Sequence, residues 1–406
     1  MSADSDRPRA GDRALVCRCN GVTRGDVLRS IARGRRTVQQ VSSDTAAGAS
    51  CGSCRRELAR LLGGRGDCDD SRPSAVCACT ELDHAALRQA IAHGRYASVD
   101  HAMRALGWRN EDGCARCRPA INYYLGCADP RYVDDPQSRV ANERNHANMQ
   151  RDGTYSVVPR LFGGVVTPEQ LRAIADIAER FSVPLLKLTG AQRIDLVGIP
   201  AHDLPDVWRE LGAAGLVSGH AYARGVRSVK TCVGERFCRY GLTDAVAVGI
   251  ELEQMTWGAY TPHKVKLAVS ACARNCAEAT IKDIGLVAVE EGWDLYVGGG
   301  AGMQVRPGRR VVRVKTEREL LEHVGAFLQL YREEGFYGER TAGFVERVGL
   351  QYVQERIVKD PHGRSALLGA FYRAQRDAQA DPWQEVSEAD PPTGLVPLSR
   401  LRRAAS

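Results

Sequence analysis

Cysteine spacing constrains this chain more than any other feature, because twelve of its fourteen cysteines fall into three sets of four. Each of the first two sets joins a Cys-x-Cys pair to a Cys-x-x-Cys pair. The third set joins a Cys-x5-Cys pair to a Cys-x3-Cys pair. The sets are Cys17, Cys19, Cys51 and Cys54; Cys77, Cys79, Cys114 and Cys117; and Cys232, Cys238, Cys272 and Cys276. Without an export signal, such pairs favour metal binding or redox chemistry over disulfides.

The bulk composition excludes several classes of protein. A length of 406 residues with 44% hydrophobic content predicts two to four domains. The net charge of +7 is spread along the chain, so no nucleic-acid partner is expected, although it suits an anionic ligand. The amino terminus is polar and no window is apolar enough for a membrane span, which predicts a cytoplasmic protein. Cys68 and Cys127, outside the three sets, are predicted to be ordinary thiols.

An internal repeat occupies the first third of the chain. In each copy a helical stretch follows the Cys-x-Cys pair, at Asp26–Ala32 and at Ala85–Ala92. The Gly-, Asp- and Arg-rich stretch at 63–73 separates the copies as a linker. We therefore predict a disordered segment at 1–12 and two small helical domains at 13–66 and 74–128.

Beyond a boundary at 129–138, the chain alternates helices and strands. Thr167 and Pro168 form a strong helix start, with Gln170 able to close a capping box. Leu185–Leu188 and Ile194–Ile199 read as strands, and Asp203 opens another short helix. This order predicts an α+β architecture, with domains at 138–222 and 223–360 and a tail at 361–406.

The third cysteine set follows an alternating strand pattern. In the segment 264–270, Val265, Leu267 and Val269 share the buried face. Lys264 and Lys266 then share the other face, and we expect their ammonium groups to lie near the thiolates of the cysteine set. The Cys-x3-Cys pair is expected at a helix start, where its two sulfur atoms would lie on one face.

Three alternative interpretations apply to these residues. A four-cysteine zinc site usually shows two Cys-x2–4-Cys pairs, and the Cys-x5-Cys pair fits that pattern poorly. The third set could also consist of unrelated buried thiols. The lysine pair by itself is more typical of a solvated strand face than of a site, and only its position beside the cysteines favours a functional role.

The third set lies in segments that resemble the signature of sirohaem-dependent nitrite and sulfite reductases. The signature segments are Thr231–Tyr240 (TCVGERFCRY) and Ser270–Ala279 (SACARNCAEA). Flanking segments are similar to the large subunit of assimilatory NAD(P)H nitrite reductase. They are Asn142–Asn148 (NERNHAN), Asp152–Arg160 (DGTYSVVPR) and Leu188–Leu196 (LTGAQRIDL). The resemblance covers residues from about 14 to 360.

This resemblance implies a ferredoxin-like half domain followed by a sirohaem and [4Fe–4S] domain. It implies that the third set binds the [4Fe–4S] cluster and that Cys276 also bridges to the sirohaem iron. The implied contacts to substrate or cofactor come from basic side chains, namely Arg227, Lys264 and Lys266, with Arg193 and Lys230 as further cofactor candidates. Ala271 and Ala273 depart from the usual Gly and Pro, but neither position supplies a ligand.

The two amino-terminal sets resemble the bacterioferritin-associated-ferredoxin module, a small helical domain that binds a [2Fe–2S] cluster. The resemblance implies one or two such clusters, and a zinc knuckle is the alternative that the same spacing could build. The Gly298–Gly302 run is not read as a dinucleotide site, because the strand–turn–helix unit and its acidic residue are missing. The family places this loop against sirohaem.

The expected activity is reduction of nitrite to ammonium. The family's large subunit normally begins with an FAD- and NAD-binding half, which this sequence does not show. We therefore expect a separate flavoprotein or ferredoxin as electron donor, together with a small nitrite reductase subunit. A homodimer is expected to supply a second half domain. The alternatives are a sulfite reductase and a non-catalytic iron–sulfur electron carrier.

Overall fold

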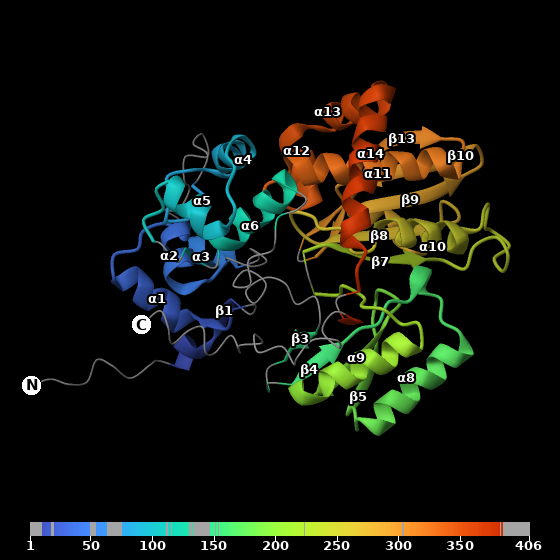
Figure 1. Cartoon of the computed structure of the whole chain (residues 1–406), viewed down its shortest axis with the longest axis horizontal. Coiled ribbons are helices and arrows are strands. Elements are labelled where there is room, and N and C mark those ends of the chain that lie inside the picture. Colours follow the sequence, from blue (N-terminus) through green and yellow to red (C-terminus); the bar gives the residue numbers. More distant parts are fainter. Residues whose placement is uncertain are drawn as a thin grey trace, which may run out of the picture. The chain divides into compact units, whose positions relative to one another are not determined.

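The computed structural model divides the chain into two compact units, Met1–Ser138 and Arg139–Ser406 (Figure 1). It describes residues 10–17, 20–48, 54–62, 75–110, 113–114, 116–129, 132, 147–150, 152, 154–222, 224–302, 304–381 and 383–384. Helices and sheets occur in separate layers, which confirms the α+β class. Within these residues, no helix has the length and apolar character that crossing a membrane requires.

The first repeat is a small helical module with a short hairpin at its start. Its elements are β1 (Leu15–Cys17), β2 (Val22–Thr23), α1 (Arg24–Ala32), α2 (Val38–Thr45) and α3 (Arg55–Leu61). Thr23 caps α1: its side chain accepts from Asp26 N at 3.2 Å, while the Asp26 carboxylate accepts from Thr23 N at 2.8 Å. Ala10–Arg13 forms a 3-10 turn, so the predicted disorder at 1–12 is wrong for residues 10–12. This turn is ordered because α1 packs against it, with Gly25 close to Asp12.

The second repeat has the same helical character. Its helices are α4 (His84–His93), α5 (Val99–Ala105) and α6 (Cys117–Ala128). Asp83 caps α4, because its carboxylate accepts from Ala86 N at 2.7 Å. Buried Leu87, Ile91 and Met103 form its core. The helices predicted at 26–32 and 85–92 are thus confirmed as parts of α1 and α4.

The half domain at 148–222 is a four-stranded antiparallel sheet with two helices. Its elements are β3 (Asn148–Met149), β4 (Tyr155–Val157), η2 (Phe162–Gly164), α8 (Pro168–Arg180), β5 (Leu185–Leu188), β6 (Ile194–Ile199), η3 (Ala201–Asp203) and α9 (Leu204–Ala213). The strand order is β3-β4-β6-β5. The predicted capping box at Thr167 and both predicted strands are confirmed.

The remaining residues form what we call the sheet domain, built on a five-stranded sheet of order β13-β10-β9-β8-β7. Its strands are β7 (Val226–Thr231), β8 (Val265–Ser270), β9 (Ile284–Val289), β10 (Gly292–Val297) and β13 (Arg309–Val314), with a small pair β11 (Gly300–Ala301) and β12 (Val305–Arg306). Its helices are α10 (Ala245–Thr256), η4 (Ala279–Ile281), α11 (Glu317–Glu334), α12 (Thr341–Val348), α13 (Leu350–Gln354), η5 (Glu355–Lys359) and α14 (Pro361–Ala378). Strands β7, β8 and β9 run parallel.

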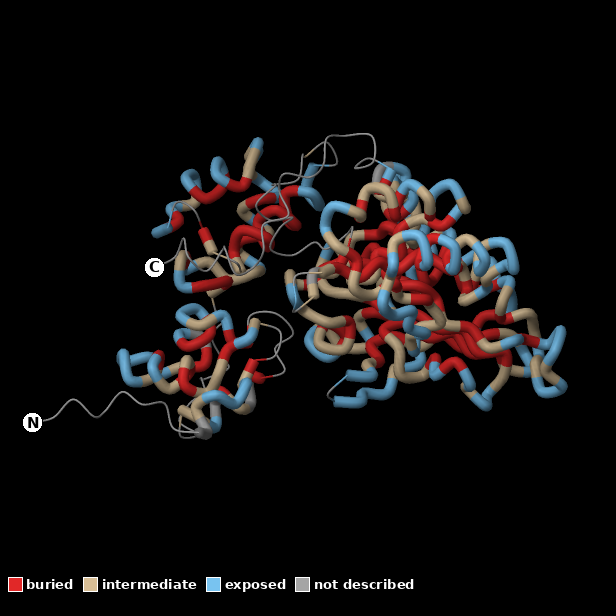
Figure 2. Tube along the Cα trace, turned by 90° about the horizontal axis from the view of Figure 1, so that it is seen from below, coloured by how far each residue is buried: buried red, intermediate tan, exposed pale blue. Residues whose placement is uncertain are grey.

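One face of this sheet packs on helices and forms the main core, which appears as the continuous buried region of Figure 2. Val265, Leu267 and Val269 of β8 belong to this core, together with Leu252 of α10 and Phe327 of α11. Lys266, between two core residues of β8, is exposed. The predicted buried face of β8 is therefore confirmed, but the alternation of buried and exposed residues holds only in its first half, because Ala268 and Ser270 on the other face are buried as well.

The carboxyl-terminal part departs from the predicted tail. Residues 361–378 form helix α14, capped by Asp360, and Leu367 and Phe371 on one side of it enter the main core. The prediction of a tail beginning at 361 is wrong because these two residues, one helical turn apart, anchor the helix on α11. Trp383 then stacks on Trp208 of α9 at a ring distance of 6.4 Å. Residues 385–406 lie outside the described part of the chain.

Candidate active site

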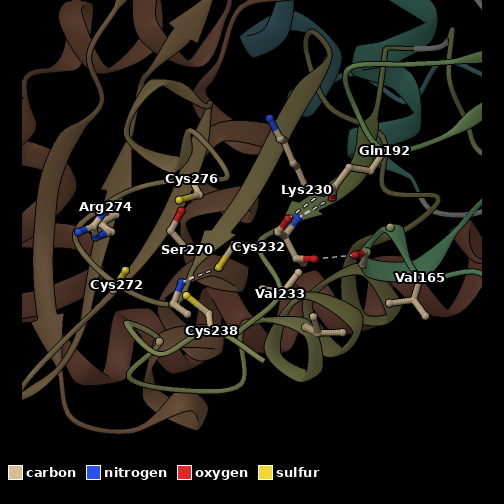
Figure 3. Close-up of a pocket in the computed structure, with 16 residues that line it drawn as sticks. Val165, Gln192, Lys230, Cys232, Val233, Cys238, Ser270, Cys272, Arg274 and Cys276 are labelled. Atoms are coloured by element: carbon tan, nitrogen blue, oxygen red, sulfur yellow. Dashed lines mark hydrogen bonds between the residues drawn. The ribbon is translucent and has the colours of Figure 1, made fainter. Parts of the chain in front are cut away.

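The third cysteine set lies at the carboxyl ends of two neighbouring parallel strands. Cys232 follows β7 directly, and Cys238 lies in the loop after it. Cys272 and Cys276 lie in the loop that follows β8. Because β7 and β8 are adjacent and parallel, both loops emerge at the same edge of the sheet. All four cysteines line one pocket of about 410 Å³ (Figure 3).

The loop that carries Cys272 and Cys276 is not the helix start that the sequence predicts. Asn275 has a left-handed backbone (φ 55°), and so has Glu278 (φ 59°), which breaks a helix between the cysteines. The Asn275 side chain holds the turn instead: its Nδ2 donates to Thr280 Oγ1 at 2.7 Å. The two sulfur atoms therefore reach the pocket from a turn.

The residues at Gly and Pro positions of the family pattern fit this loop without strain. Neither Ala271 nor Ala273 has a positive φ, so neither position needs glycine. Ala271 is buried, and its backbone N–H donates to Cys232 Sγ at 3.2 Å. An N–H bond of this kind stabilises a thiolate ligand.

A side chain of the half domain, Gln192, also lines the cysteine pocket. Gln192 spans the end of β7: its Nε2 donates to Thr231 O and its Oε1 accepts from Thr231 N, both at 2.8 Å (Figure 3). Thr231 Oγ1 donates to Gly163 O at 2.7 Å. Sequence reasoning missed Gln192, although it lies inside the quoted segment Leu188–Leu196. Gln192 and the Gly163–Gly164 turn therefore complete the pocket wall.

A fully buried ion pair supports the same wall. Arg160 of the half domain and Glu253 of α10 approach to 2.6 Å with both side chains inaccessible to solvent. Glu253 also accepts from Gly163 N at 2.9 Å and from Val229 N at 3.0 Å. Burial raises the pKa of Glu253 and lowers the pKa of Arg160, while the pairing opposes both shifts. The charged pair thus links the half domain to the sheet domain.

The predicted lysines lie away from the cysteines. Lys264 precedes β8 and Lys266 is its second residue, whereas Cys272 lies two residues beyond the last residue of that strand. The part of β8 from Lys266 to Ser270 alone spans roughly 13 Å, and neither lysine lines the cysteine pocket. The expectation that the lysines lie beside the thiolates is therefore wrong, because the two groups lie at opposite ends of one strand. Lys230 and Arg274 are the described cations that line the cysteine pocket.

Cations gather instead around the start of β8 and continue toward the cysteine pocket. We call these residues the basic band: Arg227, Lys230, Lys264, Lys266, Lys282 and Arg340. Lys230 and Lys282 both pair with Glu278, at 3.1 and 2.9 Å. Lys282 and Arg340 escaped sequence reasoning, since neither belongs to a recognised motif.

The electrostatics of the basic band favour an anion. Burial, and next the charge of Arg340, lower the pKa of both Lys264 and Lys266. His263 has a pKa well below its ordinary value, mainly through burial and then through Arg224, so it is neutral. Cations that disfavour one another's charge are stabilised by a bound anion.

The Gly298–Gly302 loop lies against the basic band. A Cβ on Gly299 would come within 2.3 Å of Lys282 O, so only glycine allows this approach. The loop leads from β10 into β11 rather than into a helix. It therefore lacks the strand–turn–helix geometry of a dinucleotide site.

Arg193 lies in the half domain and does not line the cysteine pocket. Its Nη1 donates to Gly219 O at 3.5 Å, and its Nε has no hydrogen-bond partner among the described residues. Burial, and next the charge of Arg160, lower its pKa. A buried guanidinium with an unused donor suits an anionic ligand such as a cofactor carboxylate.

The cysteines of the second module converge closely. The sulfur atoms of Cys77, Cys79, Cys114 and Cys117 all lie within 4.8 Å of one another. Cys114 Sγ and Cys117 Sγ are 3.5 Å apart, and hydrogen bonds from Cys117 and Cys77 lower the pKa of Cys114 to about 2. This set is arranged to ligate a small metal centre.

The first module is described only in part. Cys17 and Cys54 are buried in one core cluster, with 2% and 7% of their surfaces exposed. Cys19, Cys51 and Cys68 lie outside the described residues. Cys127 is exposed in the last turn of α6.

The donor sets fit the clusters that the sequence implies. Thiolates are the usual ligands of iron–sulfur clusters. The third set lines a pocket with a backbone N–H directed at a sulfur atom. The basic band and Arg193 supply cations for a macrocycle that carries carboxylates. The residues present therefore fit a [4Fe–4S] cluster, sirohaem and small iron–sulfur centres in the modules.

Three family models match successive parts of the chain. Residues 15–63 and 75–126 match the BFD-like [2Fe-2S] binding domain. Residues 148–214 match the nitrite/sulfite reductase ferredoxin-like half domain, and residues 222–364 match the nitrite and sulphite reductase 4Fe-4S domain. The expected architecture and iron–sulfur cofactors are thereby confirmed.

Individual relatives agree with these matches. A nitrite reductase [NAD(P)H] of Bacillus subtilis is 45% identical over 93% of this chain and 47% of its own length. A nitrite reductase (NADH) large subunit of Escherichia coli is 35% identical over 92% of the chain and 44% of its own length. The chain thus spans about half the length of these relatives.

A shorter relative is covered completely. An assimilatory-type sulfite reductase of Nitratidesulfovibrio vulgaris is 33% identical over 54% of this chain and 100% of its own length. The four cysteines of the third set and the whole basic band lie within residues 222–364, the part that matches the 4Fe-4S domain. The chain therefore belongs to the nitrite and sulphite reductase family, whose cofactors are sirohaem and a [4Fe–4S] cluster.

Proposed function

We propose that this chain reduces nitrite to ammonium. The observation that carries the proposal is a four-cysteine pocket at the carboxyl end of β8 together with a basic band that runs from the start of this strand to Lys230 in the pocket. The relatives named nitrite reductase match nearly the whole chain, whereas the sulfite reductase matches about half of it. We therefore propose nitrite rather than sulfite as the substrate.

The cysteine pocket is the electron-transfer end of the proposed site. When bound, the cluster and sirohaem would pass to nitrite the six electrons that its reduction to ammonium requires, and the electron donor would supply these electrons. We assign Cys232, Cys238 and Cys272 to anchoring the cluster and Cys276 to the link with sirohaem. Cys276 is the exposed member of the set and lies in the pocket beside Ser270 (Figure 3), which suits a shared ligand.

The basic band is the substrate end of the proposed site. Arg227, Lys264 and Lys266 bind the anion and stabilise negative charge on its oxygen atoms as the N–O bonds break. The two ammonium groups also donate protons to the departing oxygen atoms, because their lowered pKa makes them better acids than ordinary lysines. Arg193 and Lys230 bind cofactor carboxylates.

The amino-terminal modules deliver electrons in this proposal. Their cysteine pairs suit small iron–sulfur centres, and the Gly298–Gly302 loop lacks the geometry for a nicotinamide cofactor. We assign the role of donor to a separate flavoprotein or ferredoxin, with a small nitrite reductase subunit as a further partner. We assign the chain to the cytoplasm, because thiols that ligate iron–sulfur clusters stay reduced there.

Spectroscopy and two assays test the activity. The purified chain should show sirohaem absorption bands and should reduce nitrite with reduced methyl viologen faster than it reduces sulfite. Faster reduction of sulfite would make it a sulfite reductase, a reading that the shorter relative favours. Absence of sirohaem would leave an iron–sulfur carrier and overturn both enzymatic proposals.

A separate measurement tests the proposed homodimer. The chain matches the half-domain model once, at 148–214, and we propose that a second copy supplies the other half. Light scattering of cofactor-loaded protein should therefore give the mass of a dimer. A monomer with full sirohaem content would refute this part of the proposal.

A further inference from the structure

Arg340 is held at the edge of the basic band by a buried carboxylate. It approaches Asp283 through three hydrogen bonds: its Nη2 donates to Oδ2 at 2.7 Å and to Oδ1 at 2.9 Å, and its Nε donates to Oδ1 at 3.3 Å. The Asp283 side chain is 1% exposed, whereas that of Arg340 is 32% exposed. The guanidinium therefore has a fixed orientation yet remains accessible to solvent.

Two further donors fix Asp283 itself. Thr341 Oγ1, which is buried, donates to Oδ1 at 2.5 Å. The backbone N–H of Lys266 donates to Oδ2 at 2.9 Å. Asp283 thus links Arg340, the residue before α12, to Lys266, the second residue of β8. The guanidinium of Arg340 and the backbone N–H of Lys266 donate to the same carboxylate.

The charge of Arg340 acts on both lysines of the substrate end. After burial, it is the largest cause of the lowered pKa of Lys264 and of Lys266; the carboxylate of Asp283 opposes it at both lysines, with a smaller effect. Arginine keeps its charge throughout the pH range of an enzyme, so this influence does not titrate away. The charged and titratable groups around the two lysines are Arg224, Arg227, His263, Lys282, Asp283, Tyr331 and Arg340.

We propose that Arg340, fixed by Asp283 and Thr341, is a positioning residue that keeps Lys264 and Lys266 ready to give a proton to the bound anion. This role rests on the proposed use of the basic band in nitrite reduction. Arg340 does not itself donate the proton. It makes the neutral lysine easier to form, so the N–H bond of a lysine breaks more readily when a substrate oxygen takes the proton.

Lysine labelling in the full-length protein tests the proposal without reference to turnover. Acetic anhydride acetylates only the neutral amine, so the pH dependence of acetylation, read by peptide mass spectrometry, reports when each lysine loses its proton. In Arg340→Gln the midpoints of Lys264 and Lys266 should move to higher pH. Acetylation of Lys187, an exposed lysine of the half domain, is the control and should be the same in both proteins.

Kinetics give a second readout in the same variants. In Arg340→Gln the alkaline limb of the kcat profile should move to higher pH while kcat at neutral pH falls. Arg340→Lys keeps a positive charge and should restore most of both properties. Arg318→Gln, which removes an exposed ion pair on α11 (Arg318 is 89% exposed), is the matched control and should change neither.

Several outcomes would overturn the proposal. Unchanged labelling midpoints in a folded Arg340→Gln protein would do so, even if activity fell. If that variant does not fold, Arg340→Met, which keeps most of the side-chain stem but removes the charge, takes its place, and unchanged midpoints of Lys264 and Lys266 in it would likewise contradict the proposal. A chain that proves to reduce sulfite would contradict the proposed function and leave the labelling result intact.

Discussion

The second module and the sheet domain both bring four cysteines together, but they do so differently. In the second module, the sulfur atoms lie within 4.8 Å of one another and two of them are in contact at 3.5 Å. In the sheet domain, the four cysteines surround a pocket of about 410 Å³ without meeting that close spacing. The sulfur atoms around a single tetrahedral ion are about 4 Å apart, since each bond to zinc measures about 2.3 Å.

This difference shows how each fold sets the spacing of its cysteine ligands, and so the size of the metal centre that they can hold. The module places its second cysteine pair at the start of α6, close to the loop that carries Cys77 and Cys79. The sheet domain instead spaces its pairs by the distance between two parallel strands and the loops after them. A cubane cluster holds its ligands at separated corners and needs the wider frame, whereas a smaller centre suits the module.

Among the variants that test this comparison, replacement of Cys276, the proposed shared ligand of cluster and sirohaem, should have the largest effect on activity. We expect Cys276→Ser to abolish nitrite reduction and to alter the sirohaem absorption bands, because this cysteine is proposed to join cluster and macrocycle. The viologen-linked assay and the visible spectrum measure both effects. Cys127→Ser, an exposed thiol outside the three sets, is the control and should retain activity. Retained turnover in Cys276→Ser would show that the bridging role is wrong.

Breaking the buried ion pair between Arg160 and Glu253 should have the second largest effect. Glu253→Gln leaves the Arg160 guanidinium buried without its counter-charge, which costs about 3–5 kcal/mol in the free energy of unfolding. Urea denaturation measures this loss, and the absorption of the sheet-domain cluster should weaken with it. Glu346→Gln removes an exposed pair with Arg306 and should cost less than about 1 kcal/mol. Equal costs in the two variants would mean that the pocket wall does not depend on this pair.

Loss of a lysine should lower the rate while leaving both cysteine sets intact. We expect Lys266→Gln to reduce kcat/KM for nitrite about 100-fold, because it removes a proton donor and a cation. In the wild type, activity should fall as pH rises through the lowered pKa of Lys264 and Lys266, since only the protonated lysine donates. The alkaline limb should therefore lie below the pH at which an ordinary lysine titrates. A variant with wild-type kcat/KM would remove Lys266 from the mechanism.

The smallest effect on viologen-linked turnover should come from the second module. We expect Cys114→Ser to remove the iron–sulfur signal of that module and to slow turnover with a protein electron donor. With reduced methyl viologen, which needs no protein donor, the rate should stay within about twofold of wild type, because mutations at sites that share no partners act separately. Electron paramagnetic resonance and the two assays separate these effects. A large loss in the viologen assay would mean that the two cysteine sets are not independent.

Local patterns were the reliable part of the sequence analysis. The capping box at Thr167, the strands at 185–188 and 194–199, and the buried face of β8 depend on neighbouring residues, and all are found in the structure. Helix α14 was missed because it is held by Leu367 and Phe371, and the sequence does not show that these two residues pack in the main core. The helix predicted around Cys272 failed because Asn275 takes a left-handed conformation held by Thr280.

By itself, the sequence determined the cysteine sets, the family and the chemistry that such ligands permit, because the type and spacing of the ligands are properties of the sequence. Only the tertiary structure decided that the lysines and the cysteines lie at opposite ends of β8. It also brought Gln192, Lys282 and Arg340 to the site from distant segments. The physical reason is that parallel pairing and the buried Asp283 and Glu253 fix long-range distances, which no local pattern encodes.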